Sequence, residues 1–114
     1  MGSRWYSVVV DCRDPRAQAQ FWSAVLDLPV IHDTGDELCV GVEGSEPELT
    51  FVPVSERKTG KNRLHIDLAP DDQDAEVERV LALGATRADV GQSDVPWVVL
   101  ADPEGNEFCI LTPR

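Results

Sequence analysis

The residues of this chain that are best suited to chemistry are His65 and Asp67, in the segment NRLHIDLAPD. The chain has only two histidines, so an imidazole one residue away from a carboxylate is a notable feature. Residues two apart in a strand point to the same face of a sheet, so these two side chains are expected to lie side by side. Such a pair can hold a metal ion, exchange protons with a ligand, or form a simple ion pair.

Strand parity predicts which other side chains share that face. Segments 7–12, 48–51, 64–69 and 107–111 alternate between two sets of residues. One set, which includes Val8 and Leu64, is expected to pack under helices, and the other to line a cavity. The predicted cavity set is Ser7, Asp11, Glu48, Thr50, His65, Asp67, Glu107 and Cys109. Its carboxylates favour a cationic or amine-bearing ligand.

Three interpretations of this cavity compete. In the first, the polar residues are half-exposed, and Asp67 pairs with Arg63 or Lys61. In the second, His65 joins Glu48, Asp67 or Glu107 in a nonstandard metal site. In the third, which we favour, His65 and Asp67 bond to an organic molecule or act on it as catalytic acid and base.

Two further side chains are candidates for the lining. Trp97 stands at the start of a predicted strand, where it can form a wall of the cavity or pack in the core. Cys109 can act as a soft ligand or a nucleophile, although a buried inert thiol is the commoner role. The loop SERKTGKN carries Arg57, Lys58 and Lys61 and is expected to be a solvated rim of the cavity.

The order of the predicted elements repeats. A strand at SVVVDC leads into a helix capped by Asp14, with Pro15 as its first residue and an end at about Asp27. A strand at RLHIDLA leads into a helix capped by Asp71 or Asp72 and stopped by Gly84. Three short strands follow each helix, at 29–33, 37–43 and 48–54 and then at 85–90, 96–101 and 107–112. The chain therefore contains two βαβββ modules, at about 4–55 and 62–114, joined by a loop at 55–61.

Composition narrows the class of protein. The net charge of −11 disfavours nucleic acid and anionic membrane surfaces as partners. No apolar run approaches the ~20 residues that span a bilayer, and no secretory signal is recognisable. Cys12, Cys39 and Cys109 lack a CxxC spacing and are expected to be reduced core thiols of a cytoplasmic protein.

The segments DCRDPRAQAQFW, KNRLHIDLAPDDQDAEVERVLALGA and VLADPEGNEFCIL together resemble the vicinal oxygen chelate superfamily, the glyoxalase/bleomycin resistance/dioxygenase proteins. The resemblance covers essentially the whole chain. It implies an α+β fold in one domain, residues 1–114. In it the two modules form one curled, mostly antiparallel, eight-stranded open barrel with the helices on its convex side.

The resemblance also implies where a metal ion would be held. The family's usual ligand positions fall on Ser7, His65 and Cys109, and a fourth position falls on Glu48 or Thr50. Among these, His65 matches the family's residue type, whereas serine is a poor metal ligand and cysteine changes the preferred metal. The metal site is therefore interpreted as degenerate, with His65 and Glu48 as its remaining candidates.

Our leading hypothesis is a small-molecule-binding protein that sequesters an organic ligand or acts on it, with His65 and Asp67 as the catalytic candidates. The alternative is a metal-dependent lyase, isomerase or dioxygenase that uses His65 with carboxylates. A protein interaction module without a ligand is a further alternative. The cofactor is left open between none and a divalent metal ion, and a homodimer is expected by family analogy.

Overall fold

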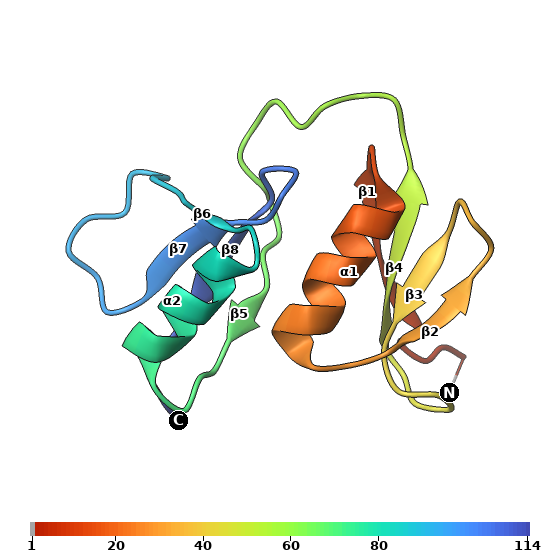
Figure 1. Ribbon diagram of the computed structural model, residues 1–114, viewed down its shortest axis with the longest axis horizontal. Coiled ribbons are helices and arrows are strands. Elements are labelled where there is room, and N and C mark those ends of the chain that lie inside the picture. Colours follow the sequence, from red (N-terminus) through yellow and green to blue (C-terminus); the bar gives the residue numbers. More distant parts are fainter. Residues whose placement is uncertain (1) are drawn as a thin grey trace. The chain divides into compact units, whose positions relative to one another are not determined.

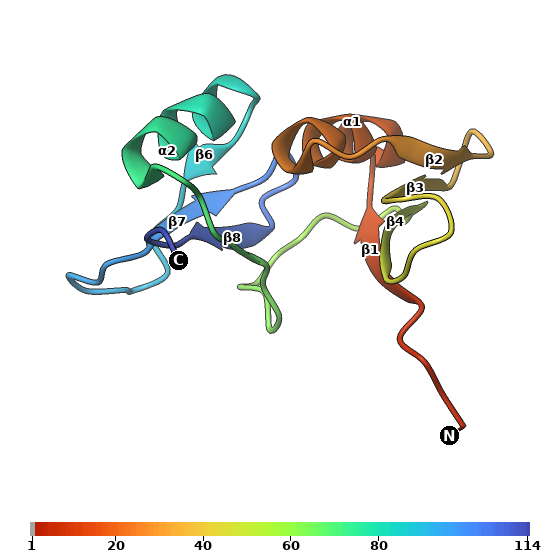
Figure 2. The same ribbon diagram turned by 90° about the horizontal axis from the view of Figure 1, so that it is seen from below.

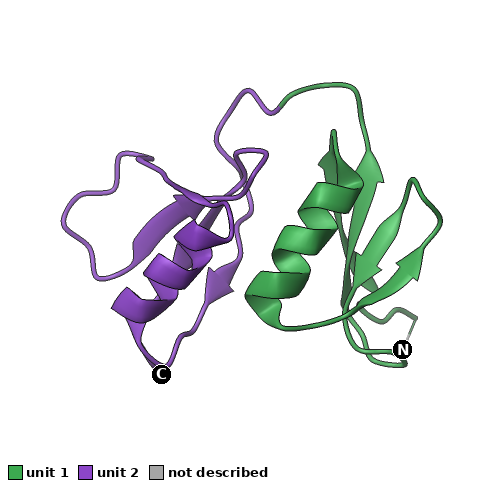
Figure 3. Ribbon diagram, viewed as in Figure 1, with its two compact units in different colours: residues 1–57 green, residues 58–114 purple. Residues whose placement is uncertain are grey.

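The computed structural model describes residues 2–114 (Figure 1). The chain forms two compact units, with a boundary between Arg57 and Lys58 (Figure 3). This boundary lies in the loop predicted at 55–61. None of the described helices is both long enough and apolar enough to cross a membrane.

Unit 1 consists of one helix and one four-stranded sheet. Its elements are β1 (Ser7–Cys12), α1 (Pro15–Leu26), β2 (Val30–Asp33), β3 (Leu38–Val40) and β4 (Glu48–Pro53). The strand order is β1-β4-β3-β2, with β1 parallel to β4 and the other neighbours antiparallel. A strand that returns parallel to the first needs a long connection, and here α1 and the β2–β3 hairpin supply it.

Unit 2 repeats this arrangement. Its elements are β5 (Asp67–Leu68), α2 (Gln73–Ala82), β6 (Thr86–Arg87), β7 (Val98–Ala101) and β8 (Glu107–Ile110). The order is β5-β8-β7-β6, again with a parallel pair, β5 and β8, at one end of the sheet. The α+β class and the twofold βαβββ order are thus confirmed.

The helix starts follow from their capping residues. The side chain of Asp14 accepts a hydrogen bond from the N–H of Ala17 at 3.0 Å, and Asp72 does the same for Ala75 at 3.1 Å. Each bond satisfies a backbone donor that the first turn leaves unpaired. The cap of the second helix is therefore Asp72, one of the two residues predicted.

In each unit the helix lies on one face of the sheet (Figure 2). The core of unit 1 includes Phe21 and Trp22, whose rings meet edge to face, and the fully buried Phe51 of β4. Phe108 and Ile110 of β8 are equally buried in unit 2. These central strands carry the alternating apolar residues that strand parity predicted.

Two expectations about the sheets are not met. The structure contains two four-stranded sheets, neither of them closed, so the single eight-stranded open barrel is not confirmed. The predicted core positions Leu64 and Val8 were wrong, because 87% of Leu64 and 38% of Val8 is exposed. Leu64 lies in a bend before β5, and a residue outside the ladder does not follow strand parity.

Candidate functional site

A pocket of about 440 Å³ lies in unit 2. Its polar lining consists of Lys61, His65, Asp67, Gln92 and Glu107, and its less polar lining of Val90, Gly91, Trp97, Val99, Cys109 and Leu111. This volume and this mixture of apolar walls with a few polar groups are typical of small-molecule sites.

The parallel pair of β5 and β8 brings Asp67 next to Cys109. The two residues are partners in the ladder, and the N–H of Cys109 donates to the carbonyl of Ile66 at 3.0 Å. A second backbone bond, from Leu111 to Leu68 at 2.9 Å, continues the same register. The positions of Asp67 and Cys109 in the pocket are therefore set by the backbone.

The turn DPEGN sets where β8 begins. A carboxylate oxygen of the buried Asp102 accepts hydrogen bonds from the N–H groups of Glu104 at 3.0 Å and Asn106 at 2.9 Å. Gly105 has a φ of +88°, a conformation that residues with a Cβ rarely adopt. This family-like motif thus has a structural role, because it turns the chain from β7 into the strand that carries Glu107 and Cys109.

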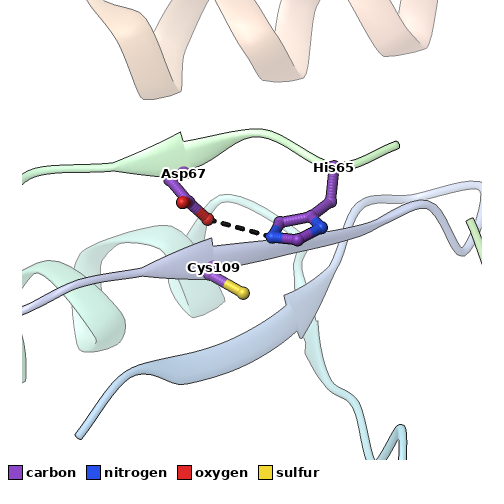
Figure 4. Close-up of side chains that lie close together, drawn as sticks. All are labelled: His65, Asp67 and Cys109. Atoms are coloured by element: carbon purple, nitrogen blue, oxygen red, sulfur yellow. Dashed lines mark ion pairs between the residues drawn. The ribbon is translucent and has the colours of Figure 1, made fainter. Parts of the chain in front are cut away.

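The group at the centre of the site is His65, Asp67 and Cys109 (Figure 4). Nε2 of His65 lies 3.1 Å from a carboxylate oxygen of Asp67. One ligand atom from each of the three residues lies within 4.8 Å of the other two. The His65 and Asp67 side chains are about half-exposed, whereas Cys109 is buried. The predicted neighbours His65 and Asp67 do form a pair, and Asp67 is not bonded to Arg63 or Lys61 in any described ion pair.

The surroundings of Cys109 argue against a free thiolate. Burial raises the pKa of the Cys109 thiol, and the nearby Asp67 carboxylate raises it further, while Lys61 acts in the opposite direction. A reactive cysteine needs a lowered pKa. Without a bound cation, Cys109 is therefore a weak nucleophile.

Glu107 is held at the edge of the pocket by the segment that begins unit 2. Its carboxylate lies 2.8 Å from Nζ of Lys58 and accepts a hydrogen bond from the N–H of Asn62 at 3.0 Å. Burial opposes the charge of Glu107, but these two partners together hold the pKa of its carboxyl below the usual value. Lys58 also donates to the carbonyl of Gly60. Lys58 is exposed, as expected of a residue at the rim, and its Nζ is also tied to the carboxylate of Glu107.

Unit 1 has its own pocket, of about 410 Å³, whose lining includes Ser7, Glu48 and Thr50. The hydroxyl groups of Ser7 and Thr50 share a hydrogen bond of 2.8 Å, and the Cys39 thiol lies 3.4 Å from the Thr50 hydroxyl. Burial raises the pKa of Cys39, although its bond to Thr50 counteracts part of this effect. Ser7, Thr50 and Cys39 are thus bonded to one another, and the lining of this pocket also contains His32, Glu37, Glu43 and Glu48.

Each unit contributes part of the predicted cavity set to its own pocket. Ser7, Glu48 and Thr50 line the pocket of unit 1, while His65, Asp67, Trp97, Glu107 and Cys109 line the pocket of unit 2. Asp11 is exposed and lines neither of them. Lys61, which was predicted in the rim of the cavity, is part of the lining. Sequence reasoning missed Gln92 because it lies in a loop, where neither parity nor helical spacing predicts the direction of a side chain. The available signal for Gln92 was the polar loop VGQSDVPW, which ends at Trp97.

Of the positions that the family resemblance implies in unit 1, Ser7 does not fit a metal ligand, whereas Glu48 offers a carboxylate. Ser7 offers a hydroxyl that is already bonded to Thr50, and a neutral hydroxyl is not among the common ligands of zinc or iron. In unit 2, by contrast, the positions of His65 and Cys109 offer nitrogen and sulfur donors, with the Asp67 carboxylate beside them.

Two βαβββ units with the helix on one face of each sheet define a paired-module α+β protein. The sequence profile of the glyoxalase-like domain family matches residues 7–111. The chain therefore belongs to this family, within the vicinal oxygen chelate superfamily.

Individual relatives are more distant. Glyoxalase 1 of Caenorhabditis elegans is 23% identical over an alignment that covers 91% of this chain. The chain spans only 41% of that relative's length. A glyoxalase/bleomycin resistance protein/dioxygenase family enzyme from Burkholderia phytofirmans PsJN has a TM-score of 0.74 at 20% identity, covering 95% of this chain and 97% of its own.

A third similar structure is TnmS3, an antibiotic binding protein from Streptomyces sp. CB03234. It has a TM-score of 0.63 at 20% identity and covers 100% of this chain and 99% of its own. At such identities, structural similarity establishes the fold and leaves the activity open.

Proposed function

We propose that the protein binds a small organic molecule in the unit 2 pocket and sequesters or acts on it. The observation that carries this proposal is the convergence of the His65–Asp67 pair with the apolar walls of one pocket, which include Trp97 and Leu111. Apolar walls contribute affinity, and a few placed polar groups fix the orientation of a ligand. TnmS3, which shares the fold, binds an antibiotic, and this gives precedent for sequestration.

His65 supplies the polar contact. When its Nε2–H donates to Asp67, the other ring nitrogen of a neutral imidazole is left as an acceptor or a base. Asp67 then holds the ring in one tautomer, as an orienting carboxylate does in acid–base catalysis. The pair therefore serves either to hold a ligand hydroxyl or to remove its proton.

The charges of the pocket support a neutral ligand over a cationic one. Asp67 is paired with His65, and Glu107 is paired with Lys58. Lys61 adds a positive charge to the lining. The positive charges of Lys58 and Lys61 offset the negative charges of the two carboxylates and reduce the attraction for amines, whereas a neutral His65 leaves the charge of Asp67 in place. We therefore propose a largely apolar molecule with one or two hydrogen-bonding groups.

A thermal-shift screen followed by calorimetry tests this proposal, with neutral apolar compounds and matched amine-bearing analogues as probes. We expect neutral compounds to bind, and both His65→Ala and Trp97→Ala to weaken binding by about tenfold, the effect of ~1.4 kcal/mol. The control is Trp5→Ala, which removes an exposed tryptophan of unit 1 that is absent from the lining. A ligand whose affinity is unchanged by His65→Ala and Trp97→Ala, or the absence of any ligand, would contradict the proposal.

A further inference from the structure

Three side chains of different donor type meet on one face of unit 2. His65 offers an imidazole nitrogen, Asp67 a carboxylate oxygen and Cys109 a thiol sulfur, all within 4.8 Å of one another (Figure 4). Asp67 and Cys109 lie in the adjacent strands β5 and β8 as direct partners in the ladder, and His65 lies just before β5. Within residues 2–114, this is the one group of three such side chains whose ligand atoms come this close.

The spacing of these donors suits a small tetrahedral ion. Zinc binds sulfur at about 2.3 Å and nitrogen or oxygen at about 2.0–2.2 Å, so its donors lie roughly 3.5 Å apart. His65 and Asp67 are already 3.1 Å apart, and their half-exposed side chains can rotate toward the fixed sulfur of Cys109. A shift of about 1 Å closes the set, which is within the range of side-chain motion without backbone change.

We propose that His65, Asp67 and Cys109 bind a thiophilic divalent metal ion of the zinc class, at a site that is complete within unit 2. A mixed nitrogen, oxygen and sulfur set favours zinc and its analogue cobalt over magnesium or calcium, which select oxygen donors. This site differs from the one implied by the family resemblance, because it needs neither Ser7 nor Glu48 and uses Asp67 as its third ligand. Three protein ligands leave one position of a tetrahedral ion open to the pocket.

Titration of the intact, metal-free chain with Co²⁺ tests this proposal, because thiolate coordination gives an intense charge-transfer absorption that other ligands lack. We expect one Co²⁺ per chain with this absorption, and displacement of Co²⁺ by Zn²⁺. Cys109→Ser should abolish the absorption, and Asp67→Asn and His65→Gln should each weaken binding at least tenfold, since even loss of an outer partner costs about 10–100-fold.

Two matched controls separate this site from the alternatives. Cys39→Ser alters a buried thiol of unit 1, and Glu48→Gln removes the carboxylate of the family-like position; both should leave Co²⁺ binding unchanged. No Co²⁺ binding by the unaltered chain, or loss of binding in either control, would overturn the proposal. If Cys109→Ser does not fold, the Co²⁺ affinities of Asp67→Asn and His65→Gln, which alter half-exposed side chains, test the proposal instead. Unchanged Co²⁺ affinity in both variants also overturns the proposal.

The metal proposal and the ligand proposal can fail independently. The Co²⁺ titration contains no organic ligand, and the ligand screen can be run with a chelator present.

Discussion

The two units share a fold but differ in the chemistry of equivalent positions. In the β1–β4 ladder Val9 is paired with Thr50, and in the β5–β8 ladder Asp67 is paired with Cys109. Aligning the helix caps of the two repeats likewise places Ser7 over His65. The repeat thus conserves the order and pairing of strands, while the residues at the centre of the pocket face are free to differ.

The two units differ in which polar side-chain atoms at the centre of each pocket remain free to contact a ligand. In unit 1, the Ser7 and Thr50 hydroxyls bond to each other and Cys39 bonds to Thr50, so the group satisfies much of its own hydrogen-bonding capacity. In unit 2, an imidazole, a carboxylate and a thiol are brought together, and each of the three can bind a metal ion or form a hydrogen bond with a ligand. The lining of the unit 1 pocket also contains His32, Glu37, Glu43 and Glu48, so the two units differ in arrangement rather than in the presence of charge. Among the described residues, only in unit 2 do a histidine, a carboxylate and a cysteine bring their ligand atoms within 4.8 Å of one another.

Strand length contributes to the same contrast. The β1–β4 ladder extends over six residue pairs, from Ser7 to Cys12 in β1. The β5–β8 ladder comprises only two, at Asp67 and Leu68, and His65 lies just before it. A residue outside a ladder is less constrained, so His65 is both exposed and able to move toward a ligand.

The largest effect on the free energy of unfolding is expected from substitutions in the two cores, and it should be similar in both units. Phe51→Ala in β4 and Ile110→Ala in β8 each empty a fully buried position. We expect losses of about 3–5 kcal/mol for the phenylalanine and about 2–5 kcal/mol for the isoleucine in the free energy of unfolding. Urea unfolding followed by circular dichroism measures both. A loss under about 1 kcal/mol at either site would mean that the corresponding core is not packed as described.

A smaller and unequal effect is expected from the ion pairs. Lys58→Gln removes the partner of Glu107, whose side chain is only 12% exposed, and should cost about 1–3 kcal/mol. Arg16→Gln breaks an exposed pair with Asp33 in unit 1 and should leave the urea midpoint unchanged within error. Equal midpoint shifts for the two variants would contradict the distinction between them.

The pH dependence of stability follows from the same pair. The pKa of Glu107 is lowered in the folded chain, because Lys58 and Asn62 together outweigh the effect of burial. Its contribution is therefore fully present above the unfolded glutamate pKa of about 4.3 and is lost as the pH falls through the lower folded value. We expect Lys58→Gln to reduce the acid-induced loss of stability relative to the unaltered chain. Unfolding curves at neutral pH and near pH 3 provide the measurement, and parallel losses in both proteins would be the contrary result.

Much of the fold could be predicted because its signals are local. Asp14 and Asp72 cap helices through a side chain that reaches only three residues ahead, and the apolar alternation around Phe51 and Phe108 directly reflects burial. The error at Leu64 arose because parity was extended beyond the last ladder bond, into a bend that the sequence does not mark.

The candidate site was only partly predictable. Parity placed His65 and Asp67 on one face on the assumption that the strand includes His65. The structure begins β5 at Asp67, but the two side chains still meet, with Nε2 of His65 3.1 Å from a carboxylate oxygen of Asp67. Parity could not place Lys58 against Glu107, because that contact depends on the path of a loop across 49 residues of separation.

The most direct test of the account is amide chemical-shift mapping of a ligand identified in the screen. We predict the largest shifts at the segments that line the unit 2 pocket, 61–67, 90–97 and 107–111, with the amides of His65, Asp67 and Cys109 among them. Shifts concentrated at Ser7, Glu48 and Thr50, with none at those three residues, would show that the functional site lies in unit 1 and would contradict the account.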